Sequence, residues 1–553
     1  MRYIFFMACL TAVTAQAQLF DRQEAFTKAD TLQGSITAER IWWDALHYDL
    51  SVAFDFGSKS LRGSNTITYK VLQPYSIMQI DLMEPLLADS VKADGKLLPV
   101  SRVGNVLYIE MPEGQQPGDI AKLTVYYQGK PRVAKLPPWD GGAIWDTDDA
   151  NQQWISVACQ GLGASVWYPN KDHQYDEADS ATMHIRVPAG LAGVANGRLT
   201  GKQAMANGDT IWSWKVVSPI NNYNFIPYIG KYAKLDTTYK GENGTLDVSL
   251  WFLKQHLDQA RSHVLPDVMR TLEAFEYWFG PYPFYADSYK MVEAPHLGME
   301  HQSAIAYGNH FMNGYLGRDL SGTGEGKDWD YIIVHESGHE WFGNNITTRD
   351  IADMWVHEGF TDYSETLFVE YWKSKENGDR YVQGIRRNIM NDTPIIGTYN
   401  VNSEGSGDMY SKGANLLHTI RTVIDNDSLF REILRGLNAD FYHQTVTSND
   451  VEQYISSKSG YDFSKVFTQY LRTTSIPLLE YRWVAVKGGM ELHYRWANIV
   501  NGFAMPVRVK IDDKELLLQP TQNWQVTSLE YGKKAPKTLF ADPNYYIQTS
   551  AVK

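Results

Sequence analysis

The spacing of hydrophobic residues along this 553-residue chain changes twice. Apolar and polar side chains alternate in residues 48–56, which is the period of a half-buried strand. From about residue 245 to residue 475 the apolar positions recur at helical spacing, as they do between Leu257 and Phe279. Alternation returns after Pro477, for example in residues 492–496. The sequence therefore predicts a β region, a mainly helical region and a second β region.

These changes divide the chain into domains. We expect an N-terminal β domain over residues 18–232, a mainly helical domain over 233–476 and a small β domain over 477–553. Hydrophobic residues make up 43% and charged residues 21%, so the chain can bury a large core and is not disordered.

Local signals predict a turn at Gly63-Ser64, a loop from Pro131 to Asp146, a helix from near Trp329, and helix N-caps at Asp427-Ser428 and Ser448-Asn449.

Residues 1–17 have the pattern of a secretory signal peptide. Arg2 precedes an apolar run over residues 4–13, and Ala15-Gln16-Ala17 forms a small-x-small cleavage site. We therefore expect export to the periplasm or the exterior. The run is about half of the roughly 20 apolar residues that span a bilayer, and no later stretch is long enough, so no transmembrane anchor is predicted.

The charge balance and the cysteine count narrow the class of protein further. The formal net charge is −13, and an acidic surface repels phosphate backbones, which excludes nucleic acid as an expected partner. Loss of the leader removes Cys9 and leaves Cys159, so no disulfide is expected. No histidine pairing is visible beside Cys159, and we interpret it as a buried, inert thiol.

A metal-binding pattern lies in residues 331–344. His335 and His339 are four positions apart, so on a helix both imidazoles project from one face and can bind one Zn²⁺. Glu336 can reach a water on the metal rather than the metal itself. Glu358 follows after eighteen further residues and supplies a third ligand. Three protein ligands leave one position open, which is the arrangement of a catalytic zinc site.

This pattern resembles the aminopeptidase N family of zinc metallopeptidases, the gluzincin exopeptidases that include leukotriene hydrolase. Residues 297–301, Leu-Gly-Met-Glu-His, are similar to the family's Gly-x-Met-Glu-Asn motif, and residues 409–414 to its Tyr-x-Lys-Gly-Ala segment. Residues 157–160 resemble the strand that supplies a second ligand for the substrate amine. The four segments occur in the family's order between about residues 40 and 475.

The resemblance implies a fold. It is a multidomain α+β architecture with an N-terminal saddle-like β domain and a thermolysin-like, mainly helical catalytic domain. Here a small C-terminal all-β domain is expected in place of the large helical C-terminal domain of many relatives.

The resemblance also implies an activity, that of a zinc-dependent aminopeptidase with one Zn²⁺ per chain, acting on peptides with a free N-terminus. Glu336 would be the general base that takes a proton from water and passes it to the leaving amine. Tyr410 would donate to the oxyanion. The expected substrate-binding residues are Glu300 and Gln160, which would hold the substrate amine, together with Gly298 and Met299.

Some positions depart from the family pattern and leave alternatives open. Leu297 and His301 replace the usual Gly and Asn of the exopeptidase motif, and His357 replaces the Asn before Glu358, which changes the first substrate pocket. A thermolysin-like endopeptidase and a non-catalytic peptide-binding relative are the competing functions. Glu300 disfavours the first, and the complete ligand set disfavours the second.

Two acidic residues follow Glu358 on the same expected helical face. Asp362 and Glu365 either orient a zinc-binding histidine or are solvated charges of the helix surface. The sequence leaves these two alternatives equal.

Overall fold

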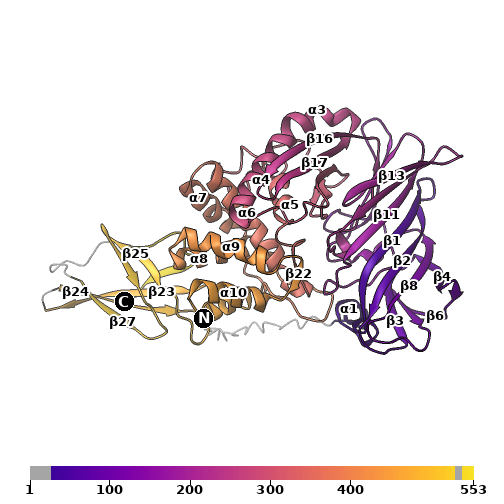
Figure 1. Ribbon diagram of the computed structural model, residues 1–553. Coiled ribbons are helices and arrows are strands. Elements are labelled where there is room, and N and C mark those ends of the chain that lie inside the picture. The colour runs from indigo at the N-terminus through magenta and orange to yellow at the C-terminus, as the bar shows by residue number, and fades with distance from the viewer. Residues whose placement is uncertain (1–25, 488, 530–537, 553) are drawn as a thin grey trace, which may run out of the picture.

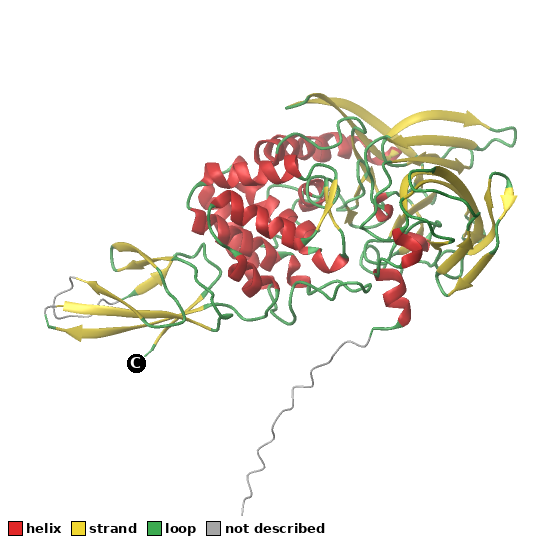
Figure 2. Cartoon of the chain, turned by 60° about the horizontal axis from the view of Figure 1, so that its bottom comes forward, coloured by secondary structure: helices red, strands yellow, loops and turns green. Residues whose placement is uncertain are grey.

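The computed structural model describes residues 26–487, 489–529 and 538–552. The predicted leader, residues 1–17, lies outside these ranges. A β-rich part, a helical part and a second β part follow one another along the molecule (Figure 1), and the helices group between the two sets of strands (Figure 2). The predicted multidomain fold class is therefore confirmed. No helix within the described ranges is both long and apolar enough to cross a membrane.

The N-terminal part is built on an eight-stranded sheet. Strand β1 (Trp43–Asp55) pairs in parallel with β11 and antiparallel with β2, and its side chains alternate between buried and more exposed positions, as the sequence predicts. The strands in spatial order are β13 (Arg198–Ala204), β14 (Thr210–Val216), β11 (Ser180–Val187), β1, β2 (Ser60–Val71), β8 (Ile120–Gly129), β4 (Leu87–Ala93) and β5 (Lys96–Leu97).

One local prediction in this part is wrong, and a second is wrong at the end of its range. Strand β2 runs through Gly63 and Ser64 without a turn, because Gly63 pairs with both neighbouring strands. The close packing of these strands requires glycine, since a Cβ at residue 63 would lie 2.4 Å from the Ser51 carbonyl oxygen. The predicted loop over residues 131–146 contains β9 (Gly142–Thr147), which pairs with β10 (Gln153–Ala158). The glycine and proline content of that loop concealed a short strand.

Smaller sheets and two short helices complete the N-terminal part. One sheet has the order β12-β15-β10-β9, and the end of β10 leads directly to Gln160. The remaining elements are α1 (Lys28–Gly34), α2 (Ala38–Ile41), β3 (Ile77–Asp81), β6 (Val100–Val103), β7 (Val106–Glu110), β12 (Ala192–Val194) and β15 (Tyr228–Gly230).

The central part combines a five-stranded sheet with the helices. The sheet order is β16 (Tyr232–Gly241), β17 (Gly244–Leu253), β18 (Tyr289–Glu293), β20 (Ile305–Tyr307) and β19 (Gly298–Met299), and β21 (Ile346–Thr348) pairs with β22 (Gln444–Val446). The helices are α3 (Leu257–Gln259), α4 (Leu265–Phe279), α5 (Tyr331–Gly338), α6 (Trp355–Trp372), α7 (Lys375–Ile385), α8 (Ser411–Ile424), α9 (Asp427–Asp440), α10 (Ser448–Ser459) and α11 (Ser464–Leu471).

Helix ends follow capping chemistry. Helix α5 begins two residues after Trp329, because the Asp330 side chain accepts a hydrogen bond from the Ile332 amide. The caps of α9 and α10 are Asn426 and Thr447, one residue before the predicted positions, and their side chains accept hydrogen bonds from the Leu429 and Asp450 amides.

The C-terminal part packs on the helices through a shared core. Leu479, Leu492 and Trp496 belong to the same buried cluster as the apolar side chains of α4, α6 and α8. The Tyr470 hydroxyl on α11 also donates to the Tyr546 carbonyl oxygen at 2.6 Å. The strands form two sheets, β27 (Gln525–Leu529), β24 (Gly489–Ala497), β23 (Leu478–Val486) and β29 (Gln548–Ala551), and β26 (Lys514–Leu518), β25 (Val507–Ile511) and β28 (Leu539–Ala541).

Candidate active site

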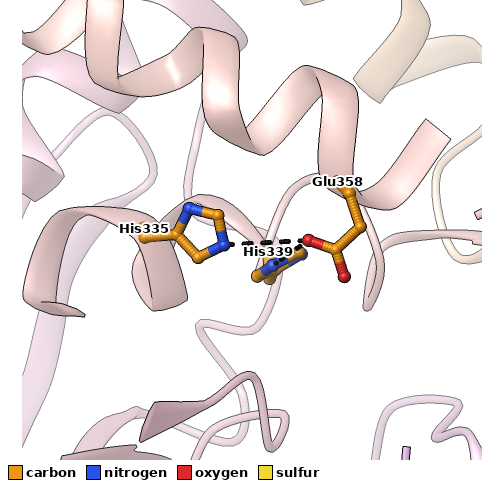
Figure 3. A group of neighbouring side chains, drawn as sticks. All are labelled: His335, His339 and Glu358. Atoms are coloured by element: carbon orange, nitrogen blue, oxygen red, sulfur yellow. Dashed lines mark ion pairs between the residues drawn. The ribbon is translucent and has the colours of Figure 1, made fainter. Parts of the chain in front are cut away.

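The three predicted metal ligands converge where α5 meets α6. Glu358 Oε2 lies 3.3 Å from His339 Nε2 and 3.7 Å from His335 Nε2 (Figure 3). His335 lies on α5, Glu358 lies on the first turn of α6, and His339 directly follows the last residue of α5. All three side chains are buried.

The hydrogen bonds of the two imidazoles turn the same ring atom toward Glu358. His335 Nδ1 donates to Glu365 Oε1 at 2.7 Å, and His339 Nδ1 donates to the Phe342 carbonyl oxygen at 3.0 Å. Both partners are acceptors, so each Nδ1 carries the hydrogen and each Nε2 presents a lone pair. This is the tautomer that a metal ligand requires.

A glycine allows the two helices to approach. A Cβ on Gly338 would lie 2.7 Å from Ser364 Oγ and 3.1 Å from a Thr361 methyl carbon on α6. Helix α5 therefore packs closely on α6 only because residue 338 has no side chain. That contact brings the ligands of α5 within reach of Glu358.

The three groups fit a metal ion. Glu358 Oε2 is buried and has no hydrogen-bond partner among the described residues, and the donor atoms of His335, His339 and Glu358 lie within 4.8 Å of one another. Burial opposes ionisation, but His339 and His335 hold the pKa of Glu358 well below its usual range, which keeps it an anionic ligand. Two imidazoles and one carboxylate form a donor set that suits catalytic zinc.

Glu336, on α5, lies beside the three metal ligands and lines the same cavity. A Cβ on Gly298 would lie 2.5 Å from Glu336 Oε1, so the carboxylate rests against the backbone of the exopeptidase motif. Burial raises the pKa of Glu336 to about 7, and the nearby charges of Glu300 and Glu358 act in the same direction. A carboxyl group with such a pKa can both accept and release a proton near neutral pH. Gly298 provides room for this group.

Glu300 and Gln160 meet beside the triad although they come from different parts of the fold. Gln160 Nε2 donates to Glu300 Oε1 at 2.7 Å and to Glu358 Oε1 at 3.0 Å. Because both partners are acceptors, the amide nitrogen faces them and the Gln160 carbonyl oxygen stays available as an acceptor. Tyr223, which the sequence analysis missed, also donates to Glu300 Oε1, at 2.9 Å. Met299 is buried in the core of the N-terminal part.

Tyr410 stands at the N-terminus of α8. Its ring stacks near that of His335, with ring centres 6.1 Å apart. Burial and the surrounding carboxylates raise its pKa well above the usual value, so the hydroxyl stays protonated and can only donate to an anion.

These groups line one cavity of about 520 Å³. The lining comes from the N-terminal part and from the central part. It comprises Pro138, Trp139, Gln160, Leu297, Gly298, Met299, Glu300, Tyr315, Leu320, Tyr331, Ile332, His335, Glu336, His339, Glu358, Asn388, Glu404 and Tyr410. The structure thus brings together every site residue that the sequence predicted.

The structure also decides between the alternatives for Asp362 and Glu365. Both side chains are buried, so neither is a solvated helix charge. Glu365 orients His335, and its other oxygen accepts a hydrogen bond from Tyr381 at 2.6 Å. Asp362 keeps one buried oxygen that has no hydrogen-bond partner in the described part of the chain. Cys159 is buried and unpaired, and burial raises its pKa, as expected for an inert thiol.

Other supporting residues gave no sequence signal of their own. Asn344 Nδ2 donates to the Glu300 backbone oxygen and to Glu340 Oε1, both at 2.8 Å. Glu340 directly follows His339 and accepts a hydrogen bond from the Ser303 amide. The segment after the second histidine therefore holds the backbone that carries Glu300.

Removing the Glu365 carboxylate should weaken metal binding. Glu365→Ala leaves His335 Nδ1 without its acceptor, and loss of such a partner typically costs 10- to 100-fold in metal affinity. Competition for Zn²⁺ with a chromogenic chelator measures the change. Glu365→Gln retains an acceptor oxygen and should lose less. Equal affinity in wild type and Glu365→Ala would show that the contact does not orient the ligand.

A known protein family matches the central part of the chain. Residues 264–470 match the model of the Peptidase family M1 domain. The central part of the chain therefore resembles a peptidase M1 domain. The aminopeptidase N resemblance drawn from the four sequence segments is confirmed.

Individual relatives are distant. Aminopeptidase N of Lactobacillus helveticus is 21% identical over 483 residues, covering 81% of this chain and 52% of the relative. Aminopeptidase 2 of Candida albicans is 19% identical over 455 residues, covering 79% and 48%. The chain thus spans about half the length of these relatives.

A solved structure shares the fold. The crystal structure of an M1 zinc metallopeptidase from Deinococcus radiodurans aligns with a TM-score of 0.67 and 20% identity, covering 78% of this chain and 95% of that one. A mutant of that M1 metallopeptidase has been crystallised with a Tyr-Ser-Ala substrate, at a TM-score of 0.66 and 21% identity, with the same coverage.

Proposed function

We propose that this protein is a zinc-dependent aminopeptidase that hydrolyses the N-terminal peptide bond of peptides. The observation that carries the proposal is the position of Glu300. Donor atoms of Glu300, Glu336 and His339 lie within 4.8 Å of one another, beside the metal triad. The α-amine and the scissile carbonyl of one residue are only two bonds apart. A site with these dimensions can therefore hold both groups at once.

Each residue has a chemical task in this reaction. Bound zinc would lower the pKa of water toward about 7 and polarise the scissile carbonyl. Glu336 takes a proton from the attacking water and delivers it to the leaving nitrogen. Tyr410 donates its hydroxyl to the carbonyl oxygen as negative charge develops there. Glu300 and the Gln160 carbonyl oxygen hold the substrate ammonium.

The Glu300 carboxylate favours this function over an endopeptidase. An endopeptidase substrate has further residues on the N-terminal side of the residue whose carbonyl is attacked. It would therefore place an amide nitrogen, not an ammonium group, against Glu300. The buried carboxylate would then lose its charged partner, and a site built for such a partner discriminates strongly against ligands that lack it. The presence of all three ligands, Glu336 and Tyr410 favours catalysis over a binding role.

A panel of amino-acid arylamides tests the proposal. Each arylamide is assayed beside its N-acetylated form, before and after treatment with a chelator, and again after zinc is restored. Cleavage confined to free amines, lost with the metal and recovered with zinc, is the expected result. Cleavage of acetylated substrates would indicate an endopeptidase, and absence of any cleavage would indicate a non-catalytic peptide-binding protein.

Tyr410→Phe should lower kcat with little effect on KM. One oxyanion donor stabilises the transition state by about 2.7–4 kcal/mol, which corresponds to about 10²–10³ in kcat. Tyr399→Phe is a matched control, since Tyr399 is partly exposed and outside the cavity. Steady-state kinetics on one arylamide measure both. A change confined to KM would contradict the oxyanion role.

Export through residues 1–17, to the periplasm or beyond, stays a prediction, because that segment lies outside the described residues.

A further inference from the structure

One carboxylate in the cavity has no role in the reaction described above. Among the described lining residues are the carboxylates of Glu300, Glu336, Glu358 and Glu404, and there is no lysine or arginine. The proposed function assigns the first three to the substrate ammonium, the proton transfer and the metal. Glu404 remains, and it lies outside every motif that the sequence indicated.

Glu404 lies beside the residues that would bind the substrate amine. A Cβ on Gly161, the neighbour of Gln160, would lie 2.5 Å from Glu404 Oε1. Within the part of the chain that the structure describes, the Glu404 carboxylate makes no hydrogen bond or ion pair, and its side chain is partly buried in the cavity wall. An ionised carboxylate in such a position lacks the partner that buried charges normally have.

The loop that carries Glu404 is fixed on both sides. Asn402 Nδ2 donates to the Gly161 carbonyl oxygen at 3.2 Å, and the Asn402 amide donates to the Asp30 carbonyl oxygen at 3.0 Å. The Ser406 amide donates to the Pro394 carbonyl oxygen at 3.1 Å. Any Cβ on Gly405 would overlap the Ile395 carbonyl oxygen. The position of the carboxylate is thus set before a substrate arrives.

The charges of the site favour a cation at this position. Burial and the charges of Glu358 and Glu300 raise the pKa of Glu404 to about 7. A divalent metal and the substrate ammonium together bring three positive charges against the four carboxylates of the cavity. When all four carboxylates are ionised, one negative charge is left over in the cavity, and a second cationic group on the substrate would balance it.

We propose that Glu404 binds the cationic side chain of an N-terminal lysine or arginine, which makes these residues the preferred substrates. The inference rests on the proposed aminopeptidase function and adds its substrate class. The cavity also presents apolar walls, among them Trp139, Leu297 and Leu320, that can pack on the methylene stem of such a side chain. Glu404 is then a specificity residue.

Matched substrates that differ in charge test this assignment. Citrulline has nearly the shape of arginine without its charge, and norleucine lacks the ammonium of lysine. We expect wild type to prefer the arginine arylamide over the citrulline arylamide by about 10- to 100-fold in kcat/KM, the range of a charged hydrogen bond in a shielded site. The lysine and norleucine pair should show the same direction.

Glu404→Gln should reduce the arginine-to-citrulline ratio to near one. The substitution keeps the side-chain size and disturbs no hydrogen bond of the folded protein, and thermal unfolding checks that the variant folds. Glu432→Gln removes the same charge from an exposed position outside the cavity and should keep the wild-type ratio. A wild type that does not discriminate, or an equal loss of both substrates in Glu404→Gln, would overturn the assignment.

Binding measurements separate this inference from the proposed function. Calorimetric titration of zinc-loaded wild type and Glu404→Gln with L-argininamide and L-citrullinamide needs no turnover. Tighter binding of argininamide that depends on Glu404 supports the inference even if no arylamide is cleaved, in which case only the proposed activity fails. Equal binding of the two amides overturns the inference, whether or not the enzyme is active.

Discussion

Glu336→Gln is expected to lower kcat by about 10²–10⁴ while the protein keeps its metal. Glutamine has the shape of glutamate but cannot take up the proton that the attacking water must lose, and general acid–base catalysis typically contributes this factor. Glu336 is not one of the three assigned ligands, His335, His339 and Glu358, so metal affinity should change little. Steady-state kinetics and metal analysis of the purified variant measure the two quantities.

A substitution at Gly298, whose backbone contacts the Glu336 carboxylate, tests the role of Glu336 in a second way. Gly298→Ala places a methyl group where Glu336 Oε1 and an Ile332 methyl carbon now lie, at 2.5 and 2.8 Å, so the base must move. This variant should also lose turnover and keep the metal. Normal turnover in Glu336→Gln would remove Glu336 from the reaction.

Glu300→Ala is expected to abolish the preference for free amines. A charge-assisted hydrogen bond to a buried carboxylate contributes about 1.5–3 kcal/mol, so kcat/KM for free-amine arylamides should fall by about 10- to 150-fold. Activity on N-acetylated forms should not fall in parallel, because those substrates bring no ammonium. The ratio of the two activities is therefore the informative measurement.

The control for Glu300 must separate charge from packing. Glu300→Gln keeps an oxygen that Gln160 and Tyr223 can still approach and removes only the charge. Glu113→Gln changes an exposed carboxylate outside the cavity and should behave as wild type. Undiminished cleavage of free-amine dipeptides by Glu300→Ala would contradict the exopeptidase assignment.

Much of the site could be predicted from the sequence because its ligands lie on adjacent helices. His335 and His339 are one helical turn apart, and Glu358 opens the next long helix, so local geometry fixes most of the triad. The alternation of β1 and the helical period of α4 likewise follow from local patterns.

Glycine and proline predicted local structure less reliably. They predicted a turn inside β2 and concealed β9, since pairing with neighbouring strands outweighs local preference.

The sequence by itself predicted the metal ligands, the general base and the order of β and helical parts, because these depend on residues close together in the chain. Only the tertiary structure decided that Glu365 orients His335, that Tyr223 and Asn344 support Glu300, and that Glu404 lines the cavity with no partner among the described residues. The hydrogen bonds among them join residues 30 to 77 positions apart. No local period encodes such distances; they arise when the N-terminal sheets pack against the central helices and bring Gln160, Glu300 and Glu404 to one cavity.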